Sequence, residues 1–182
     1  MPYETFYCRK TEHGPGTGEV PARAASAGNG CIRTGGGIVT WAYGHVLQQA
    51  EPQDYDPKYK RWNADDLPII PKKVEAPGQS GQQGPVQGHY GLIASPDVDT
   101  IVNAGDPDRE GQLLIDEILD YVGNKKPVER ILLNALDEKS IHESLDDLRS
   151  NGDFVHLKES ALARSRADWL IGMNLSRAYT LA

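Results

Sequence analysis

Apolar positions recur at regular spacing mainly in the second half of the chain. The pattern predicts a buried strand, a helix, a second strand, an amphipathic helix and a long final helix, at residues 99–105, 111–122, 129–136, 140–148 and 155–181 respectively. Asp137 or Ser140 is the expected N-cap of the amphipathic helix, because either side chain can accept a hydrogen bond from a free backbone N–H. A strand, a crossover helix and a second strand imply parallel pairing through a right-handed connection.

The first half of the chain is less regular. Residues 31–33 and 38–41 flank a glycine-rich turn and predict a hairpin, whereas residues 65–71 are punctuated by prolines and predict irregular chain. Residues 1–30 and 74–90 have no hydrophobic period and are rich in glycine. Long structureless stretches are uncommon inside a compact domain, so both are atypical of the fold that the remainder predicts.

Composition and charge then narrow the class of protein. The 182 residues include no run of about 18 apolar residues that would predict a membrane span, and the N-terminus lacks the layout of a signal peptide. Two cysteines, Cys8 and Cys31, argue against a disulfide framework or a zinc cluster. There are 19 Lys and Arg against 26 Asp and Glu, a net charge of -7. That balance at first argues against nucleic acid, whose partners usually carry a basic stripe.

The strongest chemical signal is the acidic turn at residues 106–111, which follows the first predicted strand. Ligands of open α/β sheets bind at this end of the strands. Pro107 keeps the chain before it extended, so Asp106 and Asp108 are expected to point to one side, with Glu110 on the first helical turn. Three such carboxylates suit Mg²⁺, which prefers oxygen ligands. Alternatively, Asp108 and Glu110 only cap the helix and interact with its dipole.

These residues carry a resemblance to a known family. Residues 104–112, Ala-Gly-Asp-Pro-Asp-Arg-Glu-Gly-Gln, resemble the signature of the TOPRIM domain that topoisomerases and primases share. The similarity is greatest to type IA DNA topoisomerases of the bacterial topoisomerase III kind. It extends in the same order to further segments, at residues 38–45, 59–63, 67–70, 160–174 and 176–179.

The resemblance implies a fold and an activity. The fold is α/β: a TOPRIM (Rossmann-like) domain with a mostly parallel central sheet over residues 1–152, followed by the start of a helical domain at residues 153–182. The activity is Mg²⁺-dependent cleavage of one DNA strand by a tyrosine, strand passage and religation, which relaxes or decatenates DNA. The implied partner is a single-stranded region of DNA in the bacterial cytoplasm, at the nucleoid or a plasmid, without a membrane or a nucleotide cofactor.

The resemblance also assigns roles around the acidic turn. Asp106, Asp108 and Glu110 match the carboxylates that hold Mg²⁺ near the scissile phosphate, where the ion can orient the phosphate and stabilise charge. Glu110 and Arg109 are the catalytic candidates, with Arg109 pairing with a phosphate oxygen. The alternative for Arg109 is a solvated surface arginine.

The final predicted helix adds a candidate DNA surface. At about 100° per residue, Arg166 and Arg177 lie about 20° apart on the helix, with Trp169 about 60° to the other side of Arg166. Two cations and a ring on one face suit phosphates and a stacked base, although a core tryptophan on an arginine-decorated helix gives the same pattern. In the family, the matching tryptophan and arginine face DNA, as does the counterpart of Trp62. His45 falls near the site by resemblance, with a structural histidine as the alternative.

Two family features do not match this chain. The family begins with a strand reading Phe-Ile-Ala-Glu-Lys-Pro-Ser, whose glutamate is catalytic, whereas residues 6–12 read Phe-Tyr-Cys-Arg-Lys-Thr-Glu. The sheet is therefore expected to be incomplete. The family's nucleophilic tyrosine lies beyond the TOPRIM domain, and Tyr179 matches a different position.

The genetic code offers an explanation for the first mismatch. Codons can be chosen so that residues 6–12, read one base later, give the family strand, and residues 74–90 can be encoded to give a basic, family-like sequence in the same way. We therefore interpret 1–30 and 74–90 as either disordered or read out of frame. Sequencing of the locus tests the second interpretation, which fails if the neighbouring frame does not encode these family segments.

Three functions follow from these observations. They are the N-terminal part of a type IA topoisomerase, a small TOPRIM nuclease or primase-like protein, and a catalytically inactive DNA-binding fragment. Residues 155–182 favour the first over the second, whereas the missing tyrosine and glutamate favour the third for the chain as written. The net charge no longer excludes DNA, because a bound cation offsets carboxylates and because basic residues gather in the last segment, at Lys158, Arg164, Arg166 and Arg177.

Overall fold

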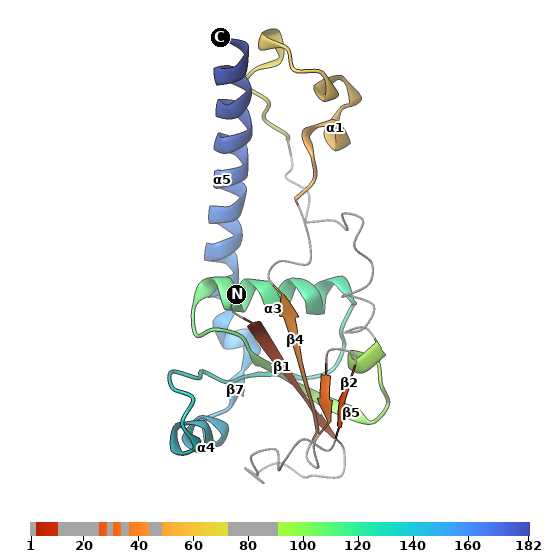
Figure 1. Ribbon diagram of the computed structural model, residues 1–182, viewed down its shortest axis with the longest axis vertical. Coiled ribbons are helices and arrows are strands. Elements are labelled where there is room, and N and C mark those ends of the chain that lie inside the picture. The colour runs from red at the N-terminus through yellow and green to blue at the C-terminus, as the bar shows by residue number, and fades with distance from the viewer. Residues whose placement is uncertain (1–2, 11–25, 29–30, 34–36, 44–48, 73–90) are drawn as a thin grey trace.

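The computed structural model describes residues 3–10, 26–28, 31–33, 37–43, 49–72 and 91–182. Figure 1 shows two parts. One is a β-sheet covered by helix α3 (Arg109–Tyr121), and the other is helix α5 (Val155–Leu181), which rises away from the sheet with residues 49–72 beside its outer half. Among the described residues, no helix combines the length and the apolar character needed to cross a membrane.

The sheet has seven strands in the order β2-β3-β4-β1-β5-β6-β7. Their bounds are Tyr3–Lys10 (β1), Ser26–Gly28 (β2), Cys31–Arg33 (β3), Gly37–Tyr43 (β4), Val98–Ala104 (β5), Val128–Arg130 (β6) and Arg149–Ser150 (β7). An α/β fold is confirmed, but a mostly parallel sheet is wrong: of the pairings between described strands, only β5–β6 is parallel. The short connections from β2 to β3 and from β3 to β4 allow only antiparallel pairing, whereas the α3 crossover permits the parallel β5–β6 pair. Strand β1 also pairs antiparallel with β4 and β5, although longer stretches of chain separate these strands in the sequence.

Strand β1 corrects a second expectation. Residues 1–30 were expected to lack regular structure, yet Tyr3–Lys10 lies in the middle of the sheet, paired with both β4 and β5. Thr5, for example, faces Trp41 on one side and Ala104 on the other. Main-chain hydrogen bonds to two neighbours do not depend on a hydrophobic period within the strand. Residues 74–90 lie outside the described part of the chain.

The predicted strand–helix–strand unit is confirmed, with one shortened element. The apolar face of α3 packs on the sheet, in a core of Ile38, Ala42, Ile93, Val98, Ile101, Leu114, Ile115, Ile118 and Leu119. Strand β6 ends at Arg130 rather than continuing to residue 136. An apolar run fixes the presence of a strand better than its end, and here Leu136 is 81% exposed after the chain has left the sheet.

The remaining helices follow the sequence pattern closely. Helix α4 spans Glu138–Asp146, and the Asp137 side chain accepts a hydrogen bond from the Ser140 backbone N–H over 3.0 Å, which confirms Asp137 as its N-cap. Helix α5 has the bounds that the period predicts, and a 3-10 helix, η3 (Asn151–Phe154), leads into it. Beside the outer half of α5 lie three short helices, α1 (Pro52–Tyr55), η1 (Pro57–Lys60) and η2 (Ala64–Asp66).

Candidate functional site

The acidic turn, residues 106–111, joins the end of β5 to the start of α3. Asp108 is the N-cap of α3: its Oδ1 accepts a hydrogen bond from the backbone N–H of Gly111 over 2.8 Å. The backbone N–H of Asp108 donates to the carbonyl of Asp106 over 2.7 Å. A Cβ at Gly111 would lie 2.5 Å from that same carbonyl oxygen, so the turn can fold back on itself only with glycine there. The capping role of Asp108 is confirmed.

The carboxylates of the turn do not form a preformed metal-binding site. Asp106 and Asp108 are exposed, but the part of the chain that the structure describes holds no group of three or more His, Cys, Asp or Glu side chains that could bind a metal ion. Oε1 of Glu110 lies 3.5 Å from Nε of Arg109 and 3.9 Å from Nη1 of Arg164. The expected convergence is therefore not found, because the cap turns Asp108 toward the helix end while the two arginines hold Glu110.

Arg130 of β6 fixes the backbone of the turn from beneath. Its side chain is 0% exposed. Nη1 donates to the carbonyl oxygens of Asn103 over 3.2 Å and Gly105 over 2.8 Å, and Nη2 donates to the carbonyl of Asp106 over 2.6 Å. A buried guanidinium needs such acceptors, and together they set where the Asp106 side chain emerges. Sequence reasoning missed Arg130, although a charged residue inside an apolar strand run is the signal that could have found it.

A second candidate surface lies between the outer half of α5 and residues 49–72 (Figure 1). Asn174 joins the two segments: its Oδ1 accepts from the Ile69 backbone N–H over 2.7 Å, and its Nδ2 donates to the Ile69 carbonyl over 2.9 Å. The rings of Tyr55 and Trp169 meet at a centroid distance of 5.8 Å. These contacts frame a groove of about 610 Å³. It is lined by Glu51, Pro52, Gln53, Lys60, Trp62, Asp168, Trp169, Gly172, Met173, Ser176 and Arg177.

Arg177 and Trp62 form one unit within this groove. Arg177 is only 5% exposed, and its Nη1 donates to the carbonyl of Tyr59 over 2.8 Å. Its guanidinium carbon lies 5.1 Å from the centroid of the Trp62 ring, and the residue Trp62 remains 45% exposed. The face predicted on α5 therefore brings Trp169 and Arg177 together and adds Trp62 from another segment. Arg177 was expected to bind a DNA phosphate, whereas its guanidinium is already hydrogen-bonded within the protein, to the Tyr59 carbonyl.

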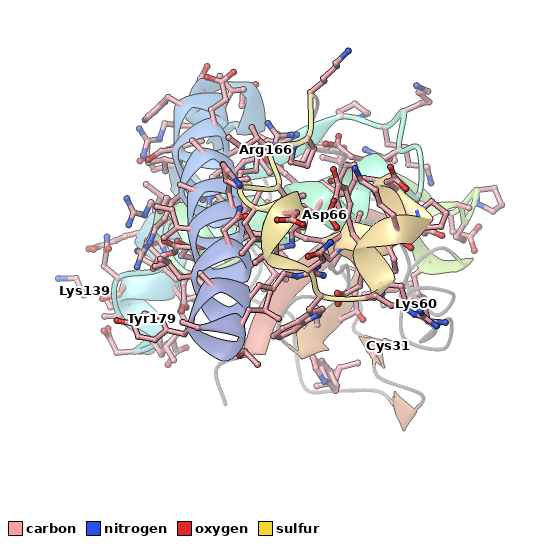
Figure 2. The ribbon with its side chains drawn as sticks, turned by 90° about the horizontal axis from the view of Figure 1, so that it is seen from above. Cys31, Lys60, Asp66, Lys139, Arg166 and Tyr179 are labelled. Carbon is pink, nitrogen blue, oxygen red and sulfur yellow. The ribbon has the colours of Figure 1, made fainter. Side chains whose placement is uncertain are left out.

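The structure leaves two predicted DNA contacts apart from the groove. Arg166 is half-buried and does not line the groove, and its Nε has no hydrogen-bond partner among the described residues. Figure 2 shows Arg166 and Asp66 on one side of α5 and Tyr179 on the opposite side. His45 lies outside the described residues.

Sequence comparison identifies the family of this chain. The chain is 48% identical over 157 residues to DNA topoisomerase 3 of Vibrio cholerae, which covers 84% of this chain and 24% of the relative. It is 42% identical over 184 residues to DNA topoisomerase 3 of Salmonella typhimurium, covering 97% of this chain and 28% of the relative. The chain belongs to the DNA topoisomerase 3 family. The resemblance found in the sequence is thereby confirmed.

Membership of the DNA topoisomerase 3 family applies to both parts of the structure. An alignment that covers 97% of the chain takes in the sheet with its acidic turn as well as α5 and its groove. The chain spans about a quarter of the length of these DNA topoisomerase 3 relatives. No protein-family model matches the chain.

Proposed function

We propose that this chain is the TOPRIM part of a type IA topoisomerase and that it binds a single-stranded region of DNA along the groove on α5. The observation that carries the proposal is the exposed Trp62 ring packed on the buried Arg177, in a groove that Trp169 also lines. A base can stack on an exposed ring whatever its sequence, and Trp62 keeps 45% of its surface exposed after Arg177 has packed on it.

The groove residues divide into two roles under this proposal. Trp62 and Trp169 offer ring faces for bases, whereas Arg177 holds Trp62 in place through its cation–π contact and its hydrogen bond to the Tyr59 carbonyl. Phosphate contacts fall to other cations along the helix. Arg166, which is half-buried on α5 outside the groove, is the cation proposed for that role.

Mg²⁺ is the proposed cofactor, held by the protein and DNA together. Asp106 and Asp108 supply exposed oxygen donors of the type that Mg²⁺ prefers, and Mg²⁺ usually binds through one or two carboxylates with water and substrate phosphate. That donor set fits the turn even though three carboxylates do not converge there. Bound Mg²⁺ would orient the phosphate and stabilise its charge, with Glu110 and Arg109 as the neighbouring catalytic candidates.

Binding of a fluorescein-labelled oligothymidine, followed by anisotropy, tests the groove. Trp62→Ala is expected to weaken binding about 5- to 150-fold, since one stacked base contributes roughly 1–3 kcal/mol. Tyr121→Ala on α3 is the matched control, because Tyr121 is an aromatic residue of nearly the same exposure, 43%, outside the groove. Equal affinity of the Trp62→Ala and wild-type chains would contradict the groove as the DNA surface.

Relaxation of negatively supercoiled plasmid in the presence of Mg²⁺, with the complete reading frame of the gene, tests the activity. Asp108→Asn is the informative variant, because asparagine is as good an N-cap as aspartate and only the charge is lost. Relaxation that depends on Asp108 supports the topoisomerase. Nicking without a covalent protein–DNA adduct supports the nuclease alternative, and binding without any change in topology supports an inactive DNA-binding protein.

A further inference from the structure

Beneath the acidic turn lies a connected set of polar side chains that the proposed DNA site does not itself use. Asn103 of β5, Gln112 of α3 and Arg130 of β6 are each 0% exposed, and Asp116 of α3 is 6% exposed. Asn151, the first residue of η3, is half-buried at their centre. The set therefore joins three elements of the sheet part to the segment that starts α5.

Asn151 uses both ends of its side-chain amide. Its Oδ1 accepts hydrogen bonds from Nδ2 of Asn103 over 3.1 Å and from Nε2 of Gln112 over 2.8 Å. Its Nδ2 donates to Oδ1 of Asp116 over 2.8 Å, while Gln112 Nε2 also donates to Oδ2 of Asp116 over 3.0 Å. The carboxylate of Asp116 is thus held at both oxygens. One asparagine thereby bonds to three side chains from two different elements.

The set reaches the acidic turn through Asn103. Because Nδ2 of Asn103 points to Asn151, its Oδ1 faces the other way, where it accepts from the Gly105 backbone N–H over 3.0 Å and from Nη1 of Arg130 over 3.0 Å. Arg130 in turn holds the carbonyls of Gly105 and Asp106. A continuous path of hydrogen bonds therefore runs from the base of α5 to the residue that carries the first carboxylate.

Buried polar networks of this kind fix position more than they add stability. An apolar core of equal volume excludes water as well, but its contacts are less directional, whereas the amide of Asn151 has one orientation that pairs both its oxygen and its nitrogen. Removing one member leaves buried donors and acceptors unpaired, so the rest of the path must rearrange. The spacing between the acidic turn and α5 is the quantity that such a network controls.

We propose that Asn151 is a positioning residue that couples metal binding at the acidic turn to DNA binding on α5. The inference rests on the proposed function, because it requires Mg²⁺ at Asp106 and Asp108 and DNA on the groove. Mg²⁺ and α5 then contact one DNA strand at a fixed separation, and each ligand strengthens the other. Without Asn151 the two surfaces still bind, but they no longer bind one strand together.

The coupling is measured as the ratio of oligothymidine affinities with Mg²⁺ and without it at equal ionic strength. Asp108→Asn supplies the baseline, since it retains the general effect of Mg²⁺ on phosphates. The wild-type ratio is expected to exceed that baseline by about 5-fold or more, the lower end of typical couplings between two sites. In Asn151→Ala the ratio is expected to fall to the baseline, with the affinity measured without Mg²⁺ unchanged.

Two further variants keep the test decisive. Asn124→Ala is the matched control, because Asn124 also makes two amide hydrogen bonds, both to Lys126 and outside the network; it should keep the wild-type ratio. Gln112→Met removes two network bonds at nearly constant volume and gives the same test if Asn151→Ala does not fold.

The outcomes separate this inference from the function on which it rests. A folded Asn151→Ala or Gln112→Met chain that retains the wild-type ratio overturns the role of Asn151 alone. A wild-type ratio equal to that of Asp108→Asn contradicts metal binding at the turn, and the inference fails with it. Circular dichroism of each variant establishes that it is folded.

Discussion

The sheet part and the outer arm of this protein are held together by different interactions. The sheet part consists of β1–β7 and α3, and the outer arm consists of residues 49–72 packed on residues 165–181 of α5. The sheet part has a continuous apolar core in which Ile101, Ile115 and Ile118 are all 0% exposed. In the outer arm the buried residues are Pro52, Ile69 and Arg177, so little apolar area is removed from water there.

The outer arm relies instead on a few directed polar contacts. Asn174 binds the backbone of Ile69 at both its N–H and its carbonyl, and Arg177 binds the carbonyl of Tyr59. Such contacts add little net stability, but breaking one leaves a buried group unpaired. The apolar core of the sheet part therefore supplies most of the stability of the fold, while a few polar contacts in the outer arm hold the groove in one shape.

The largest effect is expected from the core of the sheet part. Ile115→Ala should lower the free energy of unfolding by about 2–5 kcal/mol, because it leaves a cavity in a well-packed core. Urea denaturation followed by far-ultraviolet circular dichroism measures this loss. Ile171→Ala is the control, since Ile171 lies on α5 with 57% exposure and should change stability far less. Equal losses for both variants would contradict the contrast between the two parts.

An intermediate and local effect is expected from Asn174→Ala. The variant should release residues 49–72 from α5, a loss of about 1–3 kcal/mol for the unpaired backbone groups of Ile69. Hydrogen exchange should accelerate in residues 49–72 and remain unchanged in α3. Thr180→Ala serves for comparison, because the Thr180 hydroxyl donates within α5, to the Ser176 carbonyl. If exchange in α3 rises equally, the arm is not an independent unit.

The smallest effect is expected at α4, which has no buried residue and depends on its N-cap. The hydrogen bond from the Ser140 side chain, with that from the Ser140 backbone, lowers the pKa of Asp137 from its ordinary value. A lowered pKa in the folded state means that the carboxylate stabilises α4 above about pH 4, and that this contribution is lost as the pH falls further.

Replacement of Asp137 separates the charge from the cap. Asp137→Ala should loosen α4 at neutral pH, seen as faster amide exchange at Ser140. Asp137→Asn should keep the cap and remove its pH dependence, because asparagine caps helices without ionising. Identical pH profiles for the wild-type and Asp137→Asn chains would show that the cap does not titrate. Helix α4 thus follows in sequence after a strand of the sheet part but, like the outer arm, depends on directed polar contacts.

The sequence predicted local elements well and spatial groupings less well. The period over 155–181 reproduces α5, and the strand before the acidic turn and the helix after it both form. The convergence of Asp106, Asp108 and Glu110 was not found, because spacing along the chain does not show that Arg109 and Arg164 hold Glu110. The roles in metal and DNA binding given to these residues, and the domain boundary at residue 152, remain predictions.

The sequence pattern does not show what two residues central to the site bind. Arg130 lies in an apolar strand run and Asn174 lies in mid-helix, and each is explained only by the distant backbone groups that it binds. The central place of Tyr3–Lys10 was missed for a related reason. Strand pairing is made by main-chain groups, which are the same for every residue other than proline.

The family, the strand–helix–strand unit with its acidic turn, and the long α5 follow from the sequence alone, because periodicity, caps and motifs are local properties of the chain. Only the tertiary structure decided which way the strands run, that Arg177 supports Trp62, and that Asn151 connects the turn to α5. These features depend on groups that are distant in the sequence, and their partners are fixed only when the chain has folded and buried polar atoms must be paired.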